Sequence, residues 1–361
     1  MRESLRHALA GTSCRASGLS ARAMSSFLRS SLCTLGTCSL LWLSAAPVQA
    51  AETATAEVYS IPSAKASSAL LLSVAHAGKR VVAVGDHGHI LYSDDNGASW
   101  VQAKVPTRQL LTAVFFINDK KGWAVGHDAQ ILLSEDAGAT WTRQFQDLKR
   151  EAPLLDVWFQ NEQHGLAVGA YGALLETTDG GQHWEDVSTR LDNEDQFHLN
   201  GITAVKDSGL LVVGESGCLF RSRDWGQTWE KLHGPYEGSL FGAVGTQEAG
   251  GVLIYGLRGH LFRSSDFGDH WQQVDLQTTS GAFEFGLAEG SLLADGTLVV
   301  VGNGGSVLES RDNGQNFTIY NRPDRLALSG VGATADGKLV LVGQGGIHLA
   351  AANGAALTEQ Q

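Results

Sequence analysis

The sequence predicts an all-β protein, a seven-bladed β-propeller built from four-stranded antiparallel blades. Three observations carry this prediction. The frame Ser/Thr-x-Asp-x-Gly-x-x-Trp recurs along the chain, as at Ser134–Trp141. A short apolar run ending in glycine occurs seven times, and successive glycines lie 41, 43, 45, 42, 46 and 41 residues apart. No window shows sustained helical periodicity, and a period of about 43 residues is typical of a propeller blade.

The first 50 residues differ in kind from the rest. They carry five arginines against one glutamate, then a short apolar run that is densest at Leu40–Leu43, and they end in Ala45-Ala-Pro-Val-Gln-Ala50. This order is typical of a secretory signal peptide (residues 1–50) cleaved after Ala50, and the apolar run is too short to span ~30 Å of bilayer comfortably. The part before Met24 is superfluous to such a signal, so Met24 is an alternative start. We therefore expect a secreted, periplasmic protein that is not itself transmembrane.

Composition and charge exclude several classes of partner. The chain has 44 Gly against 6 Pro, 43% hydrophobic and only 18% charged residues, a profile that suits many short strands and turns. Its formal charge is −12, and loss of the signal, which carries five Arg and one Glu, leaves −16. Such an acidic chain disfavours nucleic acid and anionic lipid as partners. Of the four cysteines only Cys218 lies after the signal, so no internal disulfide is possible, and we expect it to face the core.

The repeat units follow in order from a short leading segment, residues 51–69. The propeller, residues 70–361, starts near Leu70, and its second unit shows strands at 111–117, 122–126, 130–134 and 141–145. Two- or three-residue corners, usually containing Gly, join the second and third strands. The seventh unit is degenerate and lacks the recurring frame. We therefore expect Glu57–Ile61 to supply the fourth strand of the last blade and close the ring, leaving no exposed edge.

The recurring frame, called the box below, is predicted to be structural. Its Asp can hydrogen-bond its own turn, its Gly allows positive φ, and its Trp offers a broad apolar surface. A row of catalytic carboxylates is the alternative interpretation, but equivalent corners of different blades lie around the rim and do not converge. The box residues concerned are Asp95, Asp136, Asp179, Asp224, Asp266 and Asp312, with Trp100, Trp141, Trp184, Trp229 and Trp271.

The motifs resemble a known family. Gly122-Trp-Ala-Val-Gly, Ile131-Leu-Leu-Ser and the box are similar to the Asp-box (BNR) repeat. Together with Leu111-Thr-Ala-Val-Phe-Phe and His164-Gly-Leu-Ala-Val-Gly, they most resemble the photosystem II stability and assembly factor family of seven-bladed propellers. The resemblance covers nearly all of residues 70–350. It implies a non-enzymatic protein that binds a membrane-protein assembly intermediate, in bacteria an accessory factor for an envelope complex or exporter.

Two other functions remain as alternatives. A sialidase-like glycosidase shares Asp boxes, but it needs three converging arginines, a Tyr/Glu nucleophile pair and an Arg-Ile-Pro motif. The nearest match here, Ser60-Ile-Pro, lacks the arginine, and no acid and nucleophile pair can be named, so we expect no catalytic residue. The third interpretation is a polysaccharide-binding propeller without catalysis.

Propeller ligands usually meet the face that carries the inter-blade loops and the corners between second and third strands. The candidate binding residues on this face are His87, His127, Tyr171, Glu215, Arg258, Tyr236, Arg322 and Arg325. His87 and Asp128 come from adjacent blades and could take part in a metal site, but the spacing of a dedicated site is missing, so we predict no metal and no cofactor. We expect a monomer with a protein partner, a membrane complex or envelope transporter.

Overall fold

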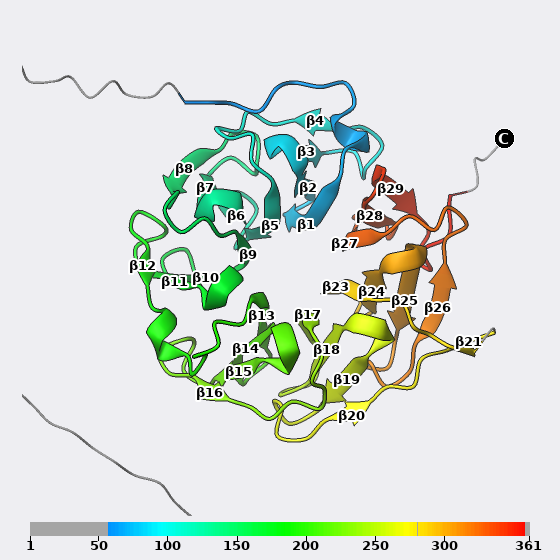
Figure 1. The fold of residues 1–361 in the computed structure, drawn as a ribbon. Coiled ribbons are helices and arrows are strands. Elements are labelled where there is room, and N and C mark those ends of the chain that lie inside the picture. Colours follow the sequence, from blue (N-terminus) through cyan, green and yellow to red (C-terminus); the bar gives the residue numbers. More distant parts are fainter. Residues whose placement is uncertain (1–56, 280, 358–361) are drawn as a thin grey trace, which may run out of the picture. The chain divides into compact units, whose positions relative to one another are not determined.

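The computed structural model describes residues 57–279 and 281–357, which form a ring of seven antiparallel sheets around a central opening (Figure 1). Six sheets have four strands and the last has three. The predicted seven-bladed propeller is therefore confirmed. The blades comprise β1 (Leu71–Ala77), β2 (Arg80–Gly85), β3 (Ile90–Ser93), β4 (Val101–Gln102); β5 (Leu111–Phe116), β6 (Gly122–Gly126), β7 (Gln130–Ser134), β8 (Thr142–Phe145); β9 (Leu154–Phe159), β10 (Gly165–Gly169), β11 (Leu174–Thr177), β12 (Glu185–Asp186); β13 (Leu199–Val205), β14 (Gly209–Gly214), β15 (Leu219–Ser222), β16 (Glu230–Lys231); β17 (Leu240–Gly245), β18 (Val252–Gly256), β19 (Leu261–Ser264), β20 (Gln272–Gln273); β23 (Leu287–Leu292), β24 (Leu298–Gly302), β25 (Ser306–Ser310), β26 (Thr318–Asn321); and β27 (Leu328–Ala333), β28 (Leu339–Gly343), β29 (Gly346–Ala350).

The first strand of every blade lines the central opening, and in the six four-stranded blades the fourth strand lies at the rim (Figure 1). Every first strand carries the same irregularity near its start. In β5, for example, Leu111 pairs with Gly126 and Ala113 with Val125, which leaves Thr112 unpaired. Such a bulge bends the strand and increases its twist. Between the fifth and sixth blades the chain adds a small hairpin that the sequence did not reveal, β21 (Gln277–Thr278) with β22 (Gly281–Ala282).

Tight turns join the second and third strands. In the first blade the turn Asp86–His89 is closed by the His89 N–H donating to the Asp86 carbonyl at 3.0 Å, and its central residues His87 and Gly88 have φ of 58° and 68°. Positive φ at both central positions is the hairpin geometry that matches the twist of the flanking strands. It also explains the glycine of the predicted corners, because L-residues seldom adopt this conformation.

The core is divided among the interfaces between blades. Seven apolar clusters occur in the described residues, one at each interface, from blade one against two to blade seven against one. The second strands are buried on both faces, so β14 reads Gly-Leu-Leu-Val-Val-Gly and is buried throughout. The box aromatics extend these clusters outward, as Trp141 does against Val82 and Leu132 in the cluster of blades one and two.

The predicted closing strand is not confirmed. Residues 57–61 lie against the outer part of the first blade, where the Ser60 N–H donates to the Val105 carbonyl at 2.9 Å and Arg108 Nε donates to the Tyr59 carbonyl at 2.8 Å. They form no strand with the last blade, whose sheet is β27-β28-β29. The ring instead closes by side-chain packing of blade seven on blade one, with Val340 and Val342 among the apolar residues of that interface.

The outer edge of the last blade is partly covered by the chain that follows it. Ala356 forms an isolated antiparallel bridge with Ala350, and the Ala351 N–H donates to the Ala355 carbonyl at 2.8 Å. The incomplete seventh unit therefore turns back on itself and needs no strand from the amino-terminal segment. The proposed signal peptide, residues 1–50, lies outside the described residues. Within the described part, no helix has the length and hydropathy required to cross a bilayer.

Candidate functional site

The six boxes form self-contained turns. In the second blade, the Ser134 hydroxyl donates to Asp136 Oδ1 at 2.9 Å, and the Gly138 N–H donates to Ser134 Oγ at 2.8 Å. The Thr140 N–H and hydroxyl both donate to the same carboxylate, at 2.9 and 2.6 Å. Trp141 Nε1 then donates to the Gly138 carbonyl at 3.0 Å. In this box each polar group of the motif is thus used inside its own turn, whereas Nε1 of Trp184 and of Trp271, in the third and fifth boxes, has no partner among the described residues.

The box carboxylates are held as anions and are not brought together. Hydrogen bonds from the side chain and backbone of Ser99 lower the pKa of Asp95 to about 2, and bonds from Asn316 do the same for Asp312. Each Asp belongs to a different blade and accepts bonds from its own box. A carboxylate with so low a pKa is a poor proton donor or acceptor near neutral pH. The geometry is that of a turn clamp, as the motif predicts.

Arginine side chains connect one blade to the box of the next. Four of them donate to a backbone carbonyl in the following box at distances between 2.8 and 3.2 Å. The pairs are Arg80 with Ala137, Arg190 with Gly226, Arg221 with Phe267, and Arg263 with Asn313. Because these guanidinium groups are committed to the blade interfaces, they are not free to converge on an anionic substrate.

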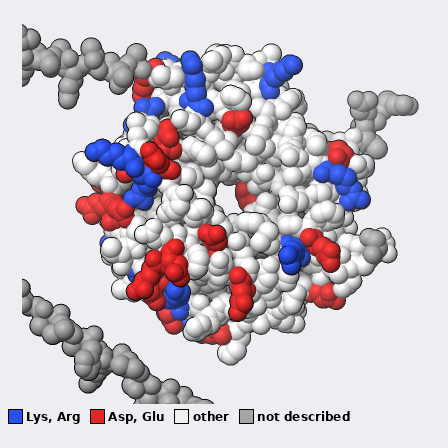
Figure 2. Space-filling view, in the orientation of Figure 1, with Lys and Arg blue, Asp and Glu red and all other residues white. Residues whose placement is uncertain are grey.

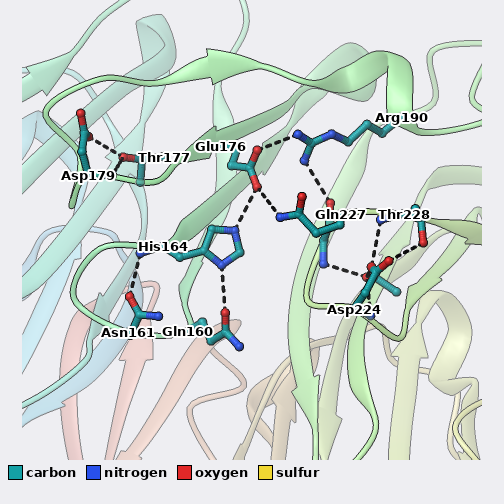
Figure 3. A network of polar contacts seen from close by, with 12 residues as sticks. Gln160, Asn161, His164, Glu176, Thr177, Asp179, Arg190, Asp224, Gln227 and Thr228 are labelled. Atoms are coloured by element: carbon teal, nitrogen blue, oxygen red, sulfur yellow. Dashed lines mark hydrogen bonds and ion pairs between the residues drawn. The ribbon is translucent and has the colours of Figure 1, made fainter.

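The most enzyme-like polar cluster, around Glu176, is a saturated network between blades three and four (Figure 3). The Glu176 carboxylate is 6% exposed and contacts His164 Nε2 at 3.0 Å, Arg190 Nη2 at 2.8 Å and Gln227 Nε2 at 3.3 Å. Burial alone would raise the pKa of Glu176, but the bonds and charges of Arg190 and His164 hold it below its ordinary value. With its acceptors occupied, this carboxylate links the two blades and offers no free general base.

The structure places most of the candidate binding residues at exposed positions on the face formed by the tight turns and inter-blade loops, called the corner face below. His87, Tyr171 and Arg258 occupy the same central turn position in blades one, three and five, with φ between 55° and 58°. His127 and Glu215 open the corresponding turns of blades two and four. On the face seen in Figure 2, acidic and basic groups are interspersed, and no basic patch extends over several blades.

The remaining candidates differ in exposure. Tyr236 is half-buried and stacks on His260 with ring centroids 4.2 Å apart. Arg325 is exposed, whereas Arg322 is 7% exposed and donates to Asp324 Oδ2 at 2.6 Å. The prediction that Arg322 belongs to a binding surface is therefore wrong, because its guanidinium lies inside the loop that it stabilises. Tyr171, at 61% exposed, is the more accessible of the two tyrosines in the set.

The structure does not support the metal site considered for His87 and Asp128. His87 Nδ1 lies 3.1 Å from Asp86 Oδ2, and Asp128 accepts a bond from Gln109 Nε2 at 2.8 Å. Within the described ranges, no three His, Cys, Asp or Glu side chains are grouped closely enough to hold a metal ion. Cys218 is 6% exposed, and burial raises its pKa to about 11, so the thiol is unreactive at neutral pH.

Two carboxylates in the central channel were missed from the sequence. Asp156 and Glu289 occupy the residue just after the bulge in β9 and β23, and both line a central cavity of about 470 Å³. Burial raises the pKa of Asp156 to about 6, although the Ile202 and Val157 N–H groups donate to it at 2.9 and 2.8 Å. Burial, and then the charge of Asp156, raise the pKa of Glu289 well above its ordinary value.

An alignment of the seven units would have revealed this pair. The other five blades place a small residue at the same position, namely Ser73, Ala113, Gly201, Gly242 and Gly330. Glycine is required in the fifth blade, where a Cβ on Gly242 would approach Tyr255 to 2.7 Å. A charged residue at a position where the other units have a small residue is therefore the signal that would have indicated these channel carboxylates. Hydrophobic periodicity alone does not show it.

Comparison with known proteins supplies relatives. Residues 143–358 match the family model described as photosynthesis system II assembly factor YCF48. Among solved structures, the chain is similar to YCF48 bound to D1 peptide, with a TM-score of 0.62 and 18% identity over 78% of this chain and 92% of that one. It is also similar to YCF48 from Cyanidioschyzon merolae, with a TM-score of 0.61 and 17% identity over 80% and 96% of the two chains.

A propeller outside this family superposes nearly as well. The WD40 domain of Doa1 has a TM-score of 0.59 and 11% identity, over 81% of this chain and 94% of the domain. Identities this low show the shared fold alone. No curated protein sequence matches the chain. The match to the family model, which spans more than half of the chain, is therefore the observation that separates this propeller from others of the same architecture.

Proposed function

Because this chain belongs to the photosystem II assembly factor YCF48 family, we propose that it is a non-enzymatic assembly factor that binds a segment of a membrane-protein complex. The family match over residues 143–358 carries the proposal. A YCF48 structure of the same fold holds a D1 peptide, which supports a protein segment as the ligand class. An assembly factor needs a rigid surface for recognition and no reacting groups.

The arrangement of polar groups favours binding over catalysis. The box carboxylates are saturated within their turns, and the Glu176 carboxylate is saturated between blades. The arginines that a sialidase would gather around a substrate carboxylate instead donate to backbone carbonyls at successive blade interfaces. The exposed side chains of the corner face, such as Tyr171 and Arg258, are suited to contact with a partner.

We place this activity in the periplasm, with a membrane complex or an exporter component as the partner. The amino-terminal order of basic, apolar and small residues supports export of the chain. The acidic composition supports a protein partner over nucleic acid. A monomeric propeller that presents its corner face to a membrane protein fits these features.

Affinity capture tests the proposal. The full chain is tagged at its carboxyl end, expressed in the organism from which it comes, and recovered from detergent-solubilised membranes. An unrelated tagged propeller serves as the control. We expect an integral membrane protein to be enriched only with this chain, and its cross-links to fall on the corner face. Equal recovery with the control would contradict the proposal, as would hydrolysis of a fluorogenic sialoside by the purified chain.

A further inference from the structure

A cavity of about 390 Å³ lies between the amino-terminal segment and the first blade. Ile61, Ser63 and Lys65 form the wall contributed by the segment. His87 and His89, both from the first tight turn, form a second wall, and Arg108 from the loop before β5 lines a third. The cavity exists because the segment lies against blade one, where Arg108 Nε holds the Tyr59 carbonyl at 2.8 Å.

One of the residues that line this cavity, His89, has an unsatisfied buried polar atom. His89 is 6% exposed, and its Nδ1 has no hydrogen-bond partner among the described residues. The Ile61 carbonyl hydrogen-bonds the same ring and favours its protonated form. A buried ring nitrogen without a partner is unfavourable unless a ligand or water completes it. The ring of His87 lies beside it, with centroids 5.7 Å apart.

The unpaired charges around the cavity are positive. Lys65 and Arg108 are exposed and form no ion pair with any described residue. Asp86 is the carboxylate of the adjacent turn, and it is already engaged, by His87 Nδ1 at 3.1 Å and by the His87 N–H at 2.7 Å. In a chain with a net charge of −12, a hollow lined by two cations without an ion pair and by an unsatisfied histidine differs from its surroundings.

We propose that this cavity binds a carboxylate of the partner protein, with Lys65 and Arg108 as its cationic contacts and the ring of His89 as a lining group beside them. The inference rests on the proposed function and adds a site and a ligand chemistry to it. Lysine and arginine pair with carboxylates through charge-assisted hydrogen bonds, and exposed Ile61 offers an apolar contact beside them. The carboxylate is either the carboxyl terminus of the partner or an Asp or Glu side chain.

Binding at this site takes up a proton. Burial, and then the neighbouring His87, lower the pKa of His89, so the ring is neutral in the free protein near neutral pH. A bound carboxylate favours the protonated ring and raises this pKa. Affinity for a carboxylate should therefore rise as pH falls below 7.

Defined peptides test the site. Fluorescein-labelled Leu-Ala-Leu-Ala is compared by fluorescence polarisation as the free acid and as the amide, together with amidated Leu-Ala-Leu-Glu, using the full chain. We expect the free acid, the Glu peptide or both to bind at least ~10-fold more tightly than the neutral amide. The comparison of the free acid with the amidated Glu peptide distinguishes a terminal from a side-chain carboxylate. No preference for a carboxylate at about 1 mM peptide, the weak end of specific recognition, overturns the proposal.

Charge-matched variants separate this site from the general field of the protein. The K65Q/R108Q variant should lose the preference for carboxylate peptides, whereas K149Q/K231Q, which removes the same charge at exposed positions elsewhere, should keep it. NMR of the histidine rings, assigned with H89Q, should show the pKa of His89 rising on addition of the peptide. Equal loss in both double variants, or an unchanged His89 titration, contradicts the site.

The same variants distinguish this inference from the proposed function. If wild-type chain and K65Q/R108Q capture the same membrane protein equally and peptides show no carboxylate preference, the site is wrong and the assembly role stands. If the wild-type chain captures no membrane protein but binds carboxylate peptides through Lys65 and Arg108, the site stands and the assembly role is wrong.

Discussion

Glu289 projects a carboxylate into the central channel without a hydrogen-bond partner among the described residues. Burial and the charge of Asp156 raise its pKa well above the unfolded value, so ionisation of Glu289 opposes folding. The sign follows from linkage: the folded state holds this proton more tightly than the unfolded chain. The cost is therefore present at neutral pH and disappears as pH falls below the unfolded pKa of about 4.3–4.5.

Replacing Glu289 with Gln should therefore stabilise the protein at pH 8. The neutral amide keeps the shape of the side chain and removes the buried charge, so we expect the melting temperature to rise by about 2 °C or more. The gain should be nearly lost at pH 4, where wild-type Glu289 is protonated in the folded state and mostly protonated in the unfolded chain. Thermal melts of E289Q at the two pH values measure this, with exposed Glu185→Gln as the control. A gain of equal size at both pH values would refute the assignment of a buried charge.

Among elements, four of the blade interfaces combine an apolar cluster with an arginine that donates to a carbonyl of the next box. Arg221 of β15 is the most enclosed of these arginines, with a side chain 6% exposed. It donates to the Phe267 carbonyl at 2.9 Å and to Asp269 Oδ1 at 2.6 Å, and its Nε donates to Glu230 at 2.9 Å. Its loss would leave a buried carbonyl unsatisfied, which costs more than the bond itself contributes.

Arg221→Met should lower the free energy of unfolding by about 2–3 kcal/mol. Methionine fills similar space without replacing the donors. Arg223→Met on the same segment is the matched control, because Arg223 is 57% exposed and lies 3.8 Å from the same Asp269. Urea denaturation of the two variants checks the difference. A loss of equal size in the control would mean that net charge, and not the link between blades, accounts for the effect.

The turn after the last blade is the second element with a measurable role. Gly354, with φ of 85°, lies so close to Val307 of blade six that a Cβ on it would approach Val307 to 2.7 Å. Val307 is 1% exposed. The segment after Ala350 therefore covers apolar surface between the last two blades.

A chain that ends at Ala350 should lose about 1–3 kcal/mol of stability, because Val307 and the outer edge of β29 become exposed. A chain that ends at Leu357 retains the described turn and serves as the control. The comparison is made by thermal melting at matched pH. Closure of the seventh blade by this turn would be disproved if both truncations melted like the full chain.

At the scale of the whole molecule, carboxylates with lowered pKa values occur in the boxes of several blades around the ring. The pKa values of Asp95, Asp179, Asp266 and Asp312 are each lowered to about 2, chiefly through hydrogen bonds within their own turns. A carboxyl group whose folded pKa is depressed adds stability above its unfolded pKa, near 3.9, and this stability is lost as pH falls towards the folded value.

We therefore expect the melting temperature to fall steeply between pH 4 and pH 2, because all four turns lose their acceptors over the same interval. A series of melts across this range measures it, and the D95N/D312N double variant should show a shallower fall from a lower starting point. A melting temperature that stays constant from pH 4 to pH 2 would contradict a stabilising role for the box carboxylates.

Much of this architecture could be predicted because its causes are local. A box such as Ser134–Trp141 satisfies its own polar groups within eight residues, and each tight turn depends on the residues that accept positive φ. The four strands of a blade are adjacent in sequence, so repeat length and turn spacing predict their pairing. The six four-stranded blades could be predicted directly from the sequence. The positions of His87, Tyr171 and Arg258 on the corner face could be predicted in the same way.

The sequence by itself therefore determined the seven-unit ring, its box turns and the family resemblance. Only the tertiary structure decided three other features: the contact of residues 57–61 with blade one, the burial of Arg322, and the meeting of Asp156 with Glu289 in the channel. Each depends on distances through space between segments far apart in the chain, which the curvature of the ring sets. Hydrogen bonding within a turn is a property of neighbours in sequence, whereas burial, charge coupling and the cavity beside His89 arise only when the blades are assembled.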